Sequence, residues 1–129
     1  MIRALKVALI VFGVVGILFG LLLIFSPGTL ASKSGVSEVA GYLKYTMATL
    51  GYCLIAPSVF LIIAARDPLR HINWVRFAIV WCILGAAVEL YSVGRSDITF
   101  GHAAVLIIMH AFFAVVFLAL YPWRHKISN

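Results

Sequence analysis

The sequence predicts an all-α integral membrane protein in which four transmembrane helices form one antiparallel bundle. Of the 129 residues, 64% are hydrophobic and only 11% are charged, whereas a soluble domain has about 25% charged residues. Four apolar runs each have about the 20 residues that a helix needs to cross roughly 30 Å of hydrocarbon. These runs are 7–25, 45–65, 75–93 and 103–121.

The runs are continuous, whereas the strands of a membrane barrel alternate apolar and polar residues. The connections between them are too short for a soluble domain. We therefore expect a single transmembrane domain over residues 1–129.

The first helix is expected at about residues 4–25. Its apolar run is longer than the roughly 7–15 residues of a signal peptide, so we expect it to be retained as a membrane helix. Pro27 and Gly28 form a stop signal after it. The small and polar residues 29–36 are expected to form a loop.

The second helix is expected at about residues 38–65, with Ser37 as its N-cap and an acidic residue, Glu38, in its first turn. Pro57 lies within this helix and should kink it.

The third helix is expected at about residues 69–93, with Asp67 as N-cap and Pro68 at the first helical position. The fourth is expected at about 98–122, with Asp97 as its N-cap.

Lysine and arginine are unevenly divided between the two sides of the predicted bundle. The positive-inside rule places the richer side, which has both termini, in the cytoplasm. The net charge of +6 indicates no nucleic-acid partner, because the basic residues flank apolar runs and meet anionic lipid head groups there. The richer side has Arg3, Lys6, Arg66, Arg70, Arg76, Arg124 and Lys126, and the other has Lys33, Lys44 and Arg95.

Gly13, Gly16 and Gly20 lie on one face of the first helix, at spacings of three and four. Small residues let two helix backbones approach closely. The sequence leaves open whether the partner is another helix of the same chain, a second copy in a homo-oligomer or a partner subunit.

Glu89 is the only acidic residue inside a long apolar run. A carboxylate at membrane depth costs about 2.5–3.5 kcal/mol on insertion scales, so it usually faces protein or trapped water and has a partner. Two interpretations follow. Glu89 is a structural residue that is hydrogen-bonded within the bundle, or it serves a ligand, a cation or a proton.

Polar side chains form a stripe on each of the last three predicted helices, which indicates an inward-facing pocket. At a rise of about 1.5 Å per residue, Glu89 lies level with Thr49 and Tyr52, and His110 lies about 10 Å deeper. We therefore expect Glu89 to bond Tyr52, Thr49 or His102, with His110 on the floor of an outward-facing pocket. The predicted ligand-binding residues are Glu89, Tyr45, Thr49, Tyr52, Ser92, His102 and His110.

Neither a cofactor nor a metal site is predicted. The motifs of phosphate-binding loops, dinucleotide sites and zinc proteases are missing from the sequence. His102 and His110 are on one helix and cannot bind opposite faces of one haem. Cys53 and Cys82 are expected to be buried thiols rather than a disulfide.

Three further features are a short basic start, a glycine-rich first helix closing at Phe25-Ser26-Pro27-Gly28, and Gly94-Arg95 after the third helix. In these features the chain resembles the DoxX-like assortment of small four-helix bacterial membrane proteins, many of which have no known function. The resemblance implies a multi-pass protein of the bacterial inner membrane and carries over no catalytic residue.

The favoured functional prediction is a binding or accessory protein that holds a small lipophilic or cationic ligand, or a partner subunit, in the outward-facing pocket. One alternative is an oligomeric proton- or cation-coupled transporter that uses Glu89, although broken-helix and inverted-repeat signals are missing. The other is an intramembrane isomerase with Glu89 and His102 or His110 as acid and base. The predicted depth difference between Glu89 and His110 counts against it.

Overall fold

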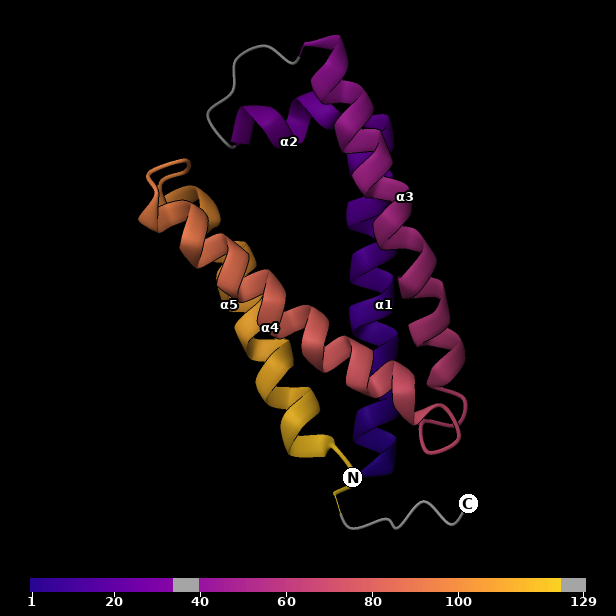
Figure 1. The fold of residues 1–129 in the computed structure, drawn as a ribbon. Coiled ribbons are helices and arrows are strands. Elements are labelled where there is room, and N and C mark those ends of the chain that lie inside the picture. The colour runs from indigo at the N-terminus through magenta and orange to yellow at the C-terminus, as the bar shows by residue number, and fades with distance from the viewer. Residues whose placement is uncertain (34–39, 124–129) are drawn as a thin grey trace.

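The computed structural model describes residues 1–33 and 40–123, which form helices and turns without any strand. Four of the helices are long and apolar enough to cross a membrane. The predictions of an all-α chain and of four candidate spans of a multi-pass membrane protein are therefore confirmed. The helices are α1 (Ile2–Phe25), α2 (Pro27–Lys33), α3 (Gly41–Ala64), α4 (Ile72–Gly94) and α5 (Phe100–Leu120) (Figure 1).

The residues after α1 differ from the prediction. Helix α1 ends at Phe25 as expected, but residues 27–33 form the short helix α2 instead of a loop. Proline has no backbone N–H and is well tolerated at the first position of a helix. Pro27 therefore both follows the end of α1 and begins α2. The predicted cap of the second long helix, Ser37 with Glu38, lies outside the described residues.

The starts of α4 and α5 also differ from the prediction. Asp67 does not cap α4. Its carboxylate accepts a hydrogen bond from the backbone N–H of Arg70 at 3.2 Å, as an N-cap would, but the turn that it starts is not continued as the helix. Helix α4 begins only at Ile72.

Helix α5 has Thr99 at its N-cap position rather than the expected Asp97. The Asp97 carboxylate instead lies 3.4 Å from the guanidinium of Arg95.

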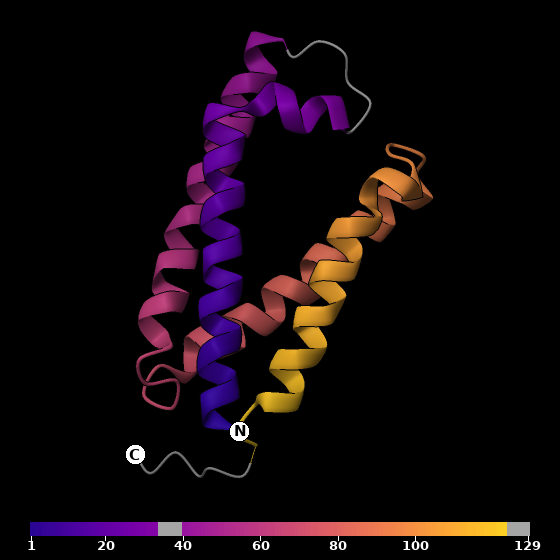
Figure 2. The ribbon, with the colours of Figure 1, turned by 180° about the vertical axis from the view of Figure 1, so that it is seen from behind.

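The long helices form two antiparallel pairs rather than one closed bundle. Helix α1 packs along α3, and α4 packs along α5 (Figures 1 and 2). The pairs meet near the end that holds Met1 and the carboxyl end of α5, which we call the amino-terminal rim. They diverge toward the end that holds α2 and the turn 95–99, the opposite rim.

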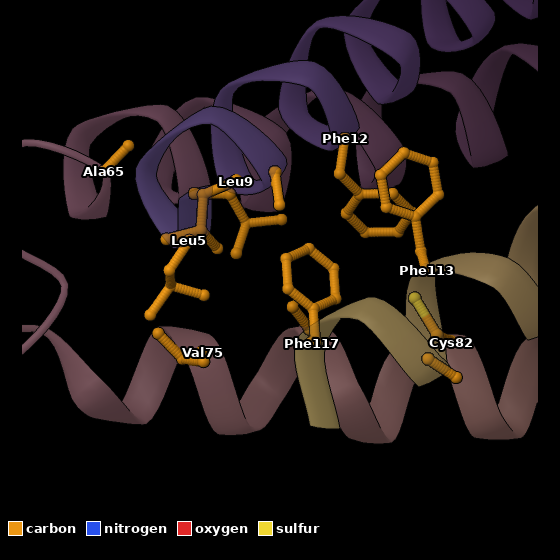
Figure 3. Packing of buried hydrophobic residues seen from close by; sticks show 12 residues of the cluster. Leu5, Leu9, Phe12, Ala65, Val75, Cys82, Phe113 and Phe117 are labelled. Carbon is orange, nitrogen blue, oxygen red and sulfur yellow. The ribbon is translucent and has the colours of Figure 1, made fainter. Parts of the chain in front are cut away.

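The two pairs are joined by an apolar cluster near the amino-terminal rim (Figure 3). The ring centroid of Phe12 lies 4.8 Å from that of Phe113 and 5.5 Å from that of Phe117. Cys82 is buried in this cluster as predicted, whereas Cys53 is exposed, so the expectation of two buried thiols is wrong for Cys53. The other buried members of the cluster are Leu5, Ala8, Leu9, Leu61, Ala65, Val75, Ala78 and Ala114.

The glycine face of α1 is covered by α3 of the same chain. A Cβ atom added at Gly20 would lie 2.7 Å from the carbonyl oxygen of Gly51, and one added at Gly51 would lie 2.6 Å from that of Gly20. A Cβ atom added at Gly13 would lie 2.8 Å from the carbonyl oxygen of Ser58, and one added at Gly16 would overlap the Ser58 hydroxyl. The structure thus uses these glycines for backbone contact within the chain, one of the alternatives that the sequence left open.

Candidate functional site

The site centres on a contact between Glu89 of α4 and His110 of α5. The Nδ1 atom of His110 lies 3.0 Å from Oε1 of Glu89, which is hydrogen-bond distance. Only 16% of the Glu89 side chain and 13% of the His110 side chain are exposed. The contact is an ion pair when His110 carries a proton on both ring nitrogens and Glu89 is ionised, and a hydrogen bond between neutral groups when the carboxyl group of Glu89 holds the proton and donates it to Nδ1.

The expectation that Glu89 bonds Tyr52, Thr49 or His102 rather than His110 is wrong. The depth estimate compared backbone positions, but helical side chains lean toward the N-terminus of their helix. Because α4 and α5 are antiparallel, Glu89 leans toward the amino-terminal rim and His110 leans toward the opposite rim. The two side chains therefore reach toward each other. Helix α4 also runs obliquely to α1 (Figure 1), so successive residues of α4 advance less along the direction of α1 than on an upright helix.

Gly85 provides the space in which His110 lies. It is four residues before Glu89, which places it one helical turn away on the same face of α4. A Cβ atom added at Gly85 would lie 2.9 Å from three ring atoms of His110. Any larger residue at this position would overlap the ring. The spacing of Gly85 and Glu89 is the sequence signal that could have indicated the pairing.

The second carboxylate oxygen of Glu89 has no hydrogen-bond partner in the described part of the chain. Oε2 is buried, and among residues 1–33 and 40–123 it contacts no donor. A buried polar atom without a partner costs free energy, and the cost is larger where lipid rather than water surrounds the protein. The pair is therefore incomplete, and an N–H, O–H or ammonium group placed at Oε2 would complete it.

The remaining predicted site residues form no hydrogen bond with the pair in the structure as described for residues 1–33 and 40–123. Tyr45 and Tyr52 are 70% and 59% exposed. The ring Nδ1 of His102 lies 2.9 Å from Oγ1 of Thr99, at the start of α5. Thr49 and Ser92 are half-buried. Of the seven residues in the predicted set, the structure joins only Glu89 and His110 by a hydrogen bond among the residues that it describes.

Grooves on the surface lie away from the pair. One is lined by Leu18, Leu21, Leu22, Phe25 and Ser26. The other lies between the start of α4 and the end of α5. Neither groove therefore contains Glu89 or His110.

No group of three or more His, Cys, Asp or Glu side chains in the described ranges could hold a metal ion. Comparison of the chain with family models, curated proteins and solved structures gives no significant match. The geometry of the Glu89–His110 pair is therefore the basis on which a function is proposed.

Replacing Gly85 with alanine is expected to push His110 away from Glu89, because the new methyl group overlaps the imidazole ring. Overpacking of this kind costs about 1–3 kcal/mol. The measurement is the midpoint of unfolding in detergent micelles. The matched control is Gly94→Ala at the end of α4, where an added Cβ has nothing within 4 Å. Equal midpoints for the two variants would show that the ring does not lie over Gly85.

Proposed function

We propose that this chain is a small integral membrane protein that binds a lipophilic cation, or a lipophilic molecule with a hydrogen-bond donor, at the Glu89–His110 pair. The observation that carries the proposal is the buried oxygen Oε2 of Glu89, which has no partner in the described residues. His110 already occupies Oε1, so the free position accepts one further donor.

The surroundings of the pair favour an amphipathic ligand. Val88 and Leu90, the sequence neighbours of Glu89, are 61% and 52% exposed and supply an apolar surface for its body. Charges interact more strongly in such a setting than in water, because the effective dielectric constant is lower. A cationic or N–H donor group on an apolar body satisfies both features.

The access route that we propose is from the outer side of the membrane. The excess of lysine and arginine on the side with both termini supports a cytoplasmic amino-terminal rim. Glu89 lies in the last two turns of α4, which ends at Gly94 at the opposite rim, and this position supports access from that direction. The resemblance to DoxX-like proteins supports the bacterial inner membrane as its location.

The direct contact between an acid and a base also favours a second candidate, a proton-coupled transporter. A cation that arrives at Glu89 competes with His110 for the carboxylate, so cation binding and proton binding at the pair are linked. Adjacent acid and base groups likewise remove the distance objection to the isomerase alternative.

The ligand proposal is tested with three probes that share one alkyl chain: octylamine, octanol and octyl sulfate. Octylamine is expected to raise the unfolding midpoint of the native chain above the shift given by octanol, because its ammonium group both donates to Oε2 and carries a charge opposite to that of the carboxylate, whereas the octanol hydroxyl only donates. Octyl sulfate is expected to give no such gain.

The control is Glu89→Gln, which keeps the shape of the side chain and removes its charge. The gain with octylamine is expected to vanish in this variant, and an equal gain in both proteins would contradict the proposal. Uptake of methyltriphenylphosphonium by reconstituted vesicles, driven by a pH gradient and lost in Glu89→Gln, would instead favour the transporter.

A further inference from the structure

A second feature of the molecule, independent of Glu89, is the groove between the first turns of α4 and the last turn of α5. It lies at the amino-terminal rim, where these segments come together. Its lining combines one cation with apolar and aromatic side chains: Arg76, Ile79, Val80, Leu118, Tyr121 and Trp123.

The guanidinium of Arg76 is held at one end of this groove. Its Nε donates a hydrogen bond to the hydroxyl of Tyr121 at 2.7 Å, and Nη1 donates to Oδ1 of Asn73 at 3.3 Å. Both partners are neutral. Among the described residues Arg76 forms no ion pair with a carboxylate, whereas Arg95 does with Asp97. The positive charge of Arg76 is thus fixed in direction but not neutralised.

The apolar walls extend from Arg76 toward the middle of the membrane. Ile79 and Val80 follow Arg76 by one turn of α4, and Leu118 precedes Tyr121 by one turn of α5. The ring of Trp123 closes the end near Tyr121, with its centroid 4.7 Å from the tyrosine ring, and its Nε1 donates to the carbonyl of Leu118 at 3.1 Å. Tryptophan and arginine at the rim with aliphatic residues beneath match the layers of a phospholipid.

We propose that this groove binds one anionic phospholipid, with its acidic head group at Arg76 and one acyl chain along Ile79, Val80 and Leu118. The charge of the groove selects the head group, since Arg76 has no acidic partner in the described part of the chain. The apolar wall requires an acyl chain, which distinguishes a lipid from a free phosphate ion. Planar arginine binds phosphate oxygens through two parallel hydrogen bonds.

The test uses the full chain in phosphatidylcholine vesicles and the quenching of tryptophan fluorescence by brominated lipid at a fixed fraction. Brominated phosphatidylglycerol is expected to quench more than brominated phosphatidylcholine, because one basic residue enriches anionic lipid about fivefold. The excess is expected to disappear in Trp123→Phe, which removes the reporter at the groove.

Two variants distinguish lipid binding in the groove from a general attraction of anionic lipids to basic residues. Arg76→Gln removes the cation, and Val80→Phe fills the wall while leaving Arg76 in place. Both are expected to abolish the excess quenching. Arg70→Gln removes one exposed positive charge from the turn before α4 and is expected to preserve it.

Equal quenching by the two brominated lipids in the native chain would overturn the proposal. So would an excess that falls as much in Arg70→Gln as in Arg76→Gln, because it would then reflect diffuse charge. An excess that survives Val80→Phe would show that the acyl chain does not lie in the groove. If Arg76→Gln does not fold, Val80→Phe and Arg70→Gln decide between these outcomes.

Discussion

Replacement of His110 with leucine is expected to destabilise the chain, and further replacement of Glu89 with leucine is expected to restore most of the lost stability. The single variant leaves the carboxylate of Glu89 buried without its partner at 3.0 Å. Breaking one side of a buried ion pair costs about 3–5 kcal/mol, whereas replacing both sides by apolar residues is often neutral. If the contact is a neutral hydrogen bond, the cost falls to about 1–2 kcal/mol.

The measurement is a double-mutant cycle of unfolding free energies in mixed micelles. Direct contact predicts a coupling energy between Glu89 and His110 well above the roughly 0.5 kcal/mol within which independent sites add. Additive losses in the two single variants and the double variant would contradict the pairing. A double variant whose unfolding free energy is restored, but whose unfolding midpoint no longer rises with octylamine, would separate the role of the pair in binding from its role in stability.

Replacement of Gly20 with leucine is expected to force α1 and α3 apart. Even a Cβ atom at this position would lie 2.7 Å from a backbone carbonyl oxygen and 2.6 Å from Cγ1 of Ile55. Backbone atoms cannot move aside as a flexible side chain does, so we expect a loss of about 3 kcal/mol or more in unfolding free energy. The control is Gly101→Leu in α5, where an added Cβ meets nothing within 4 Å.

The same variant distinguishes contact within the chain from contact between subunits. If Gly20 served a homo-oligomer, Gly20→Leu would change the oligomeric state in size-exclusion chromatography and leave the stability of each chain unchanged. A lower unfolding midpoint with no change in oligomeric state supports the packing of α1 on α3.

The number and approximate limits of the membrane helices were predictable because hydropathy and length depend on each helix alone. The arrangement in two pairs was not. Lipid is as apolar as leucine, so the apolar face of a membrane helix does not indicate which neighbour it contacts. The glycine stripe of α1 indicated a close contact with another helix. The partner residue, Gly51 of α3, is not part of a glycine stripe, so the sequence did not identify it.

The polar stripe of α3 shows the same limit. Its period placed Tyr45, Thr49 and Tyr52 on one face of the helix. It did not show whether that face contacts another helix or lies on the outside of the protein. Tyr52 follows Gly51, which contacts α1, so on a helix it lies about 100° away from that contact. Both tyrosines are exposed, and their stripe forms no hydrogen bond with Glu89 in the described structure.

The Glu89–His110 pair could have been predicted from the lean of side chains on antiparallel helices together with Gly85. The depth estimate failed because it treated each residue as a point on an upright helix. Glutamate and histidine side chains extend several ångströms from the backbone, which is comparable to the predicted depth difference. In contrast, no sequence pattern predicts that Oε2 of Glu89 lacks a donor among the described residues, because this depends on how α4 packs against α5.

The most direct test of the proposed site is solid-state NMR of the chain in lipid bilayers, with ¹⁵N-labelled histidine and ¹³C-labelled glutamate. The pairing predicts a through-space correlation between Nδ1 of His110 and the side-chain carboxyl carbon of Glu89, and a shift of the Nδ1 signal in Glu89→Gln. The variant His110→Leu assigns the signal among the four histidines. A His110 ring that lacks this correlation, and whose Nδ1 signal is unchanged in Glu89→Gln, would contradict the pairing and the binding site built on it.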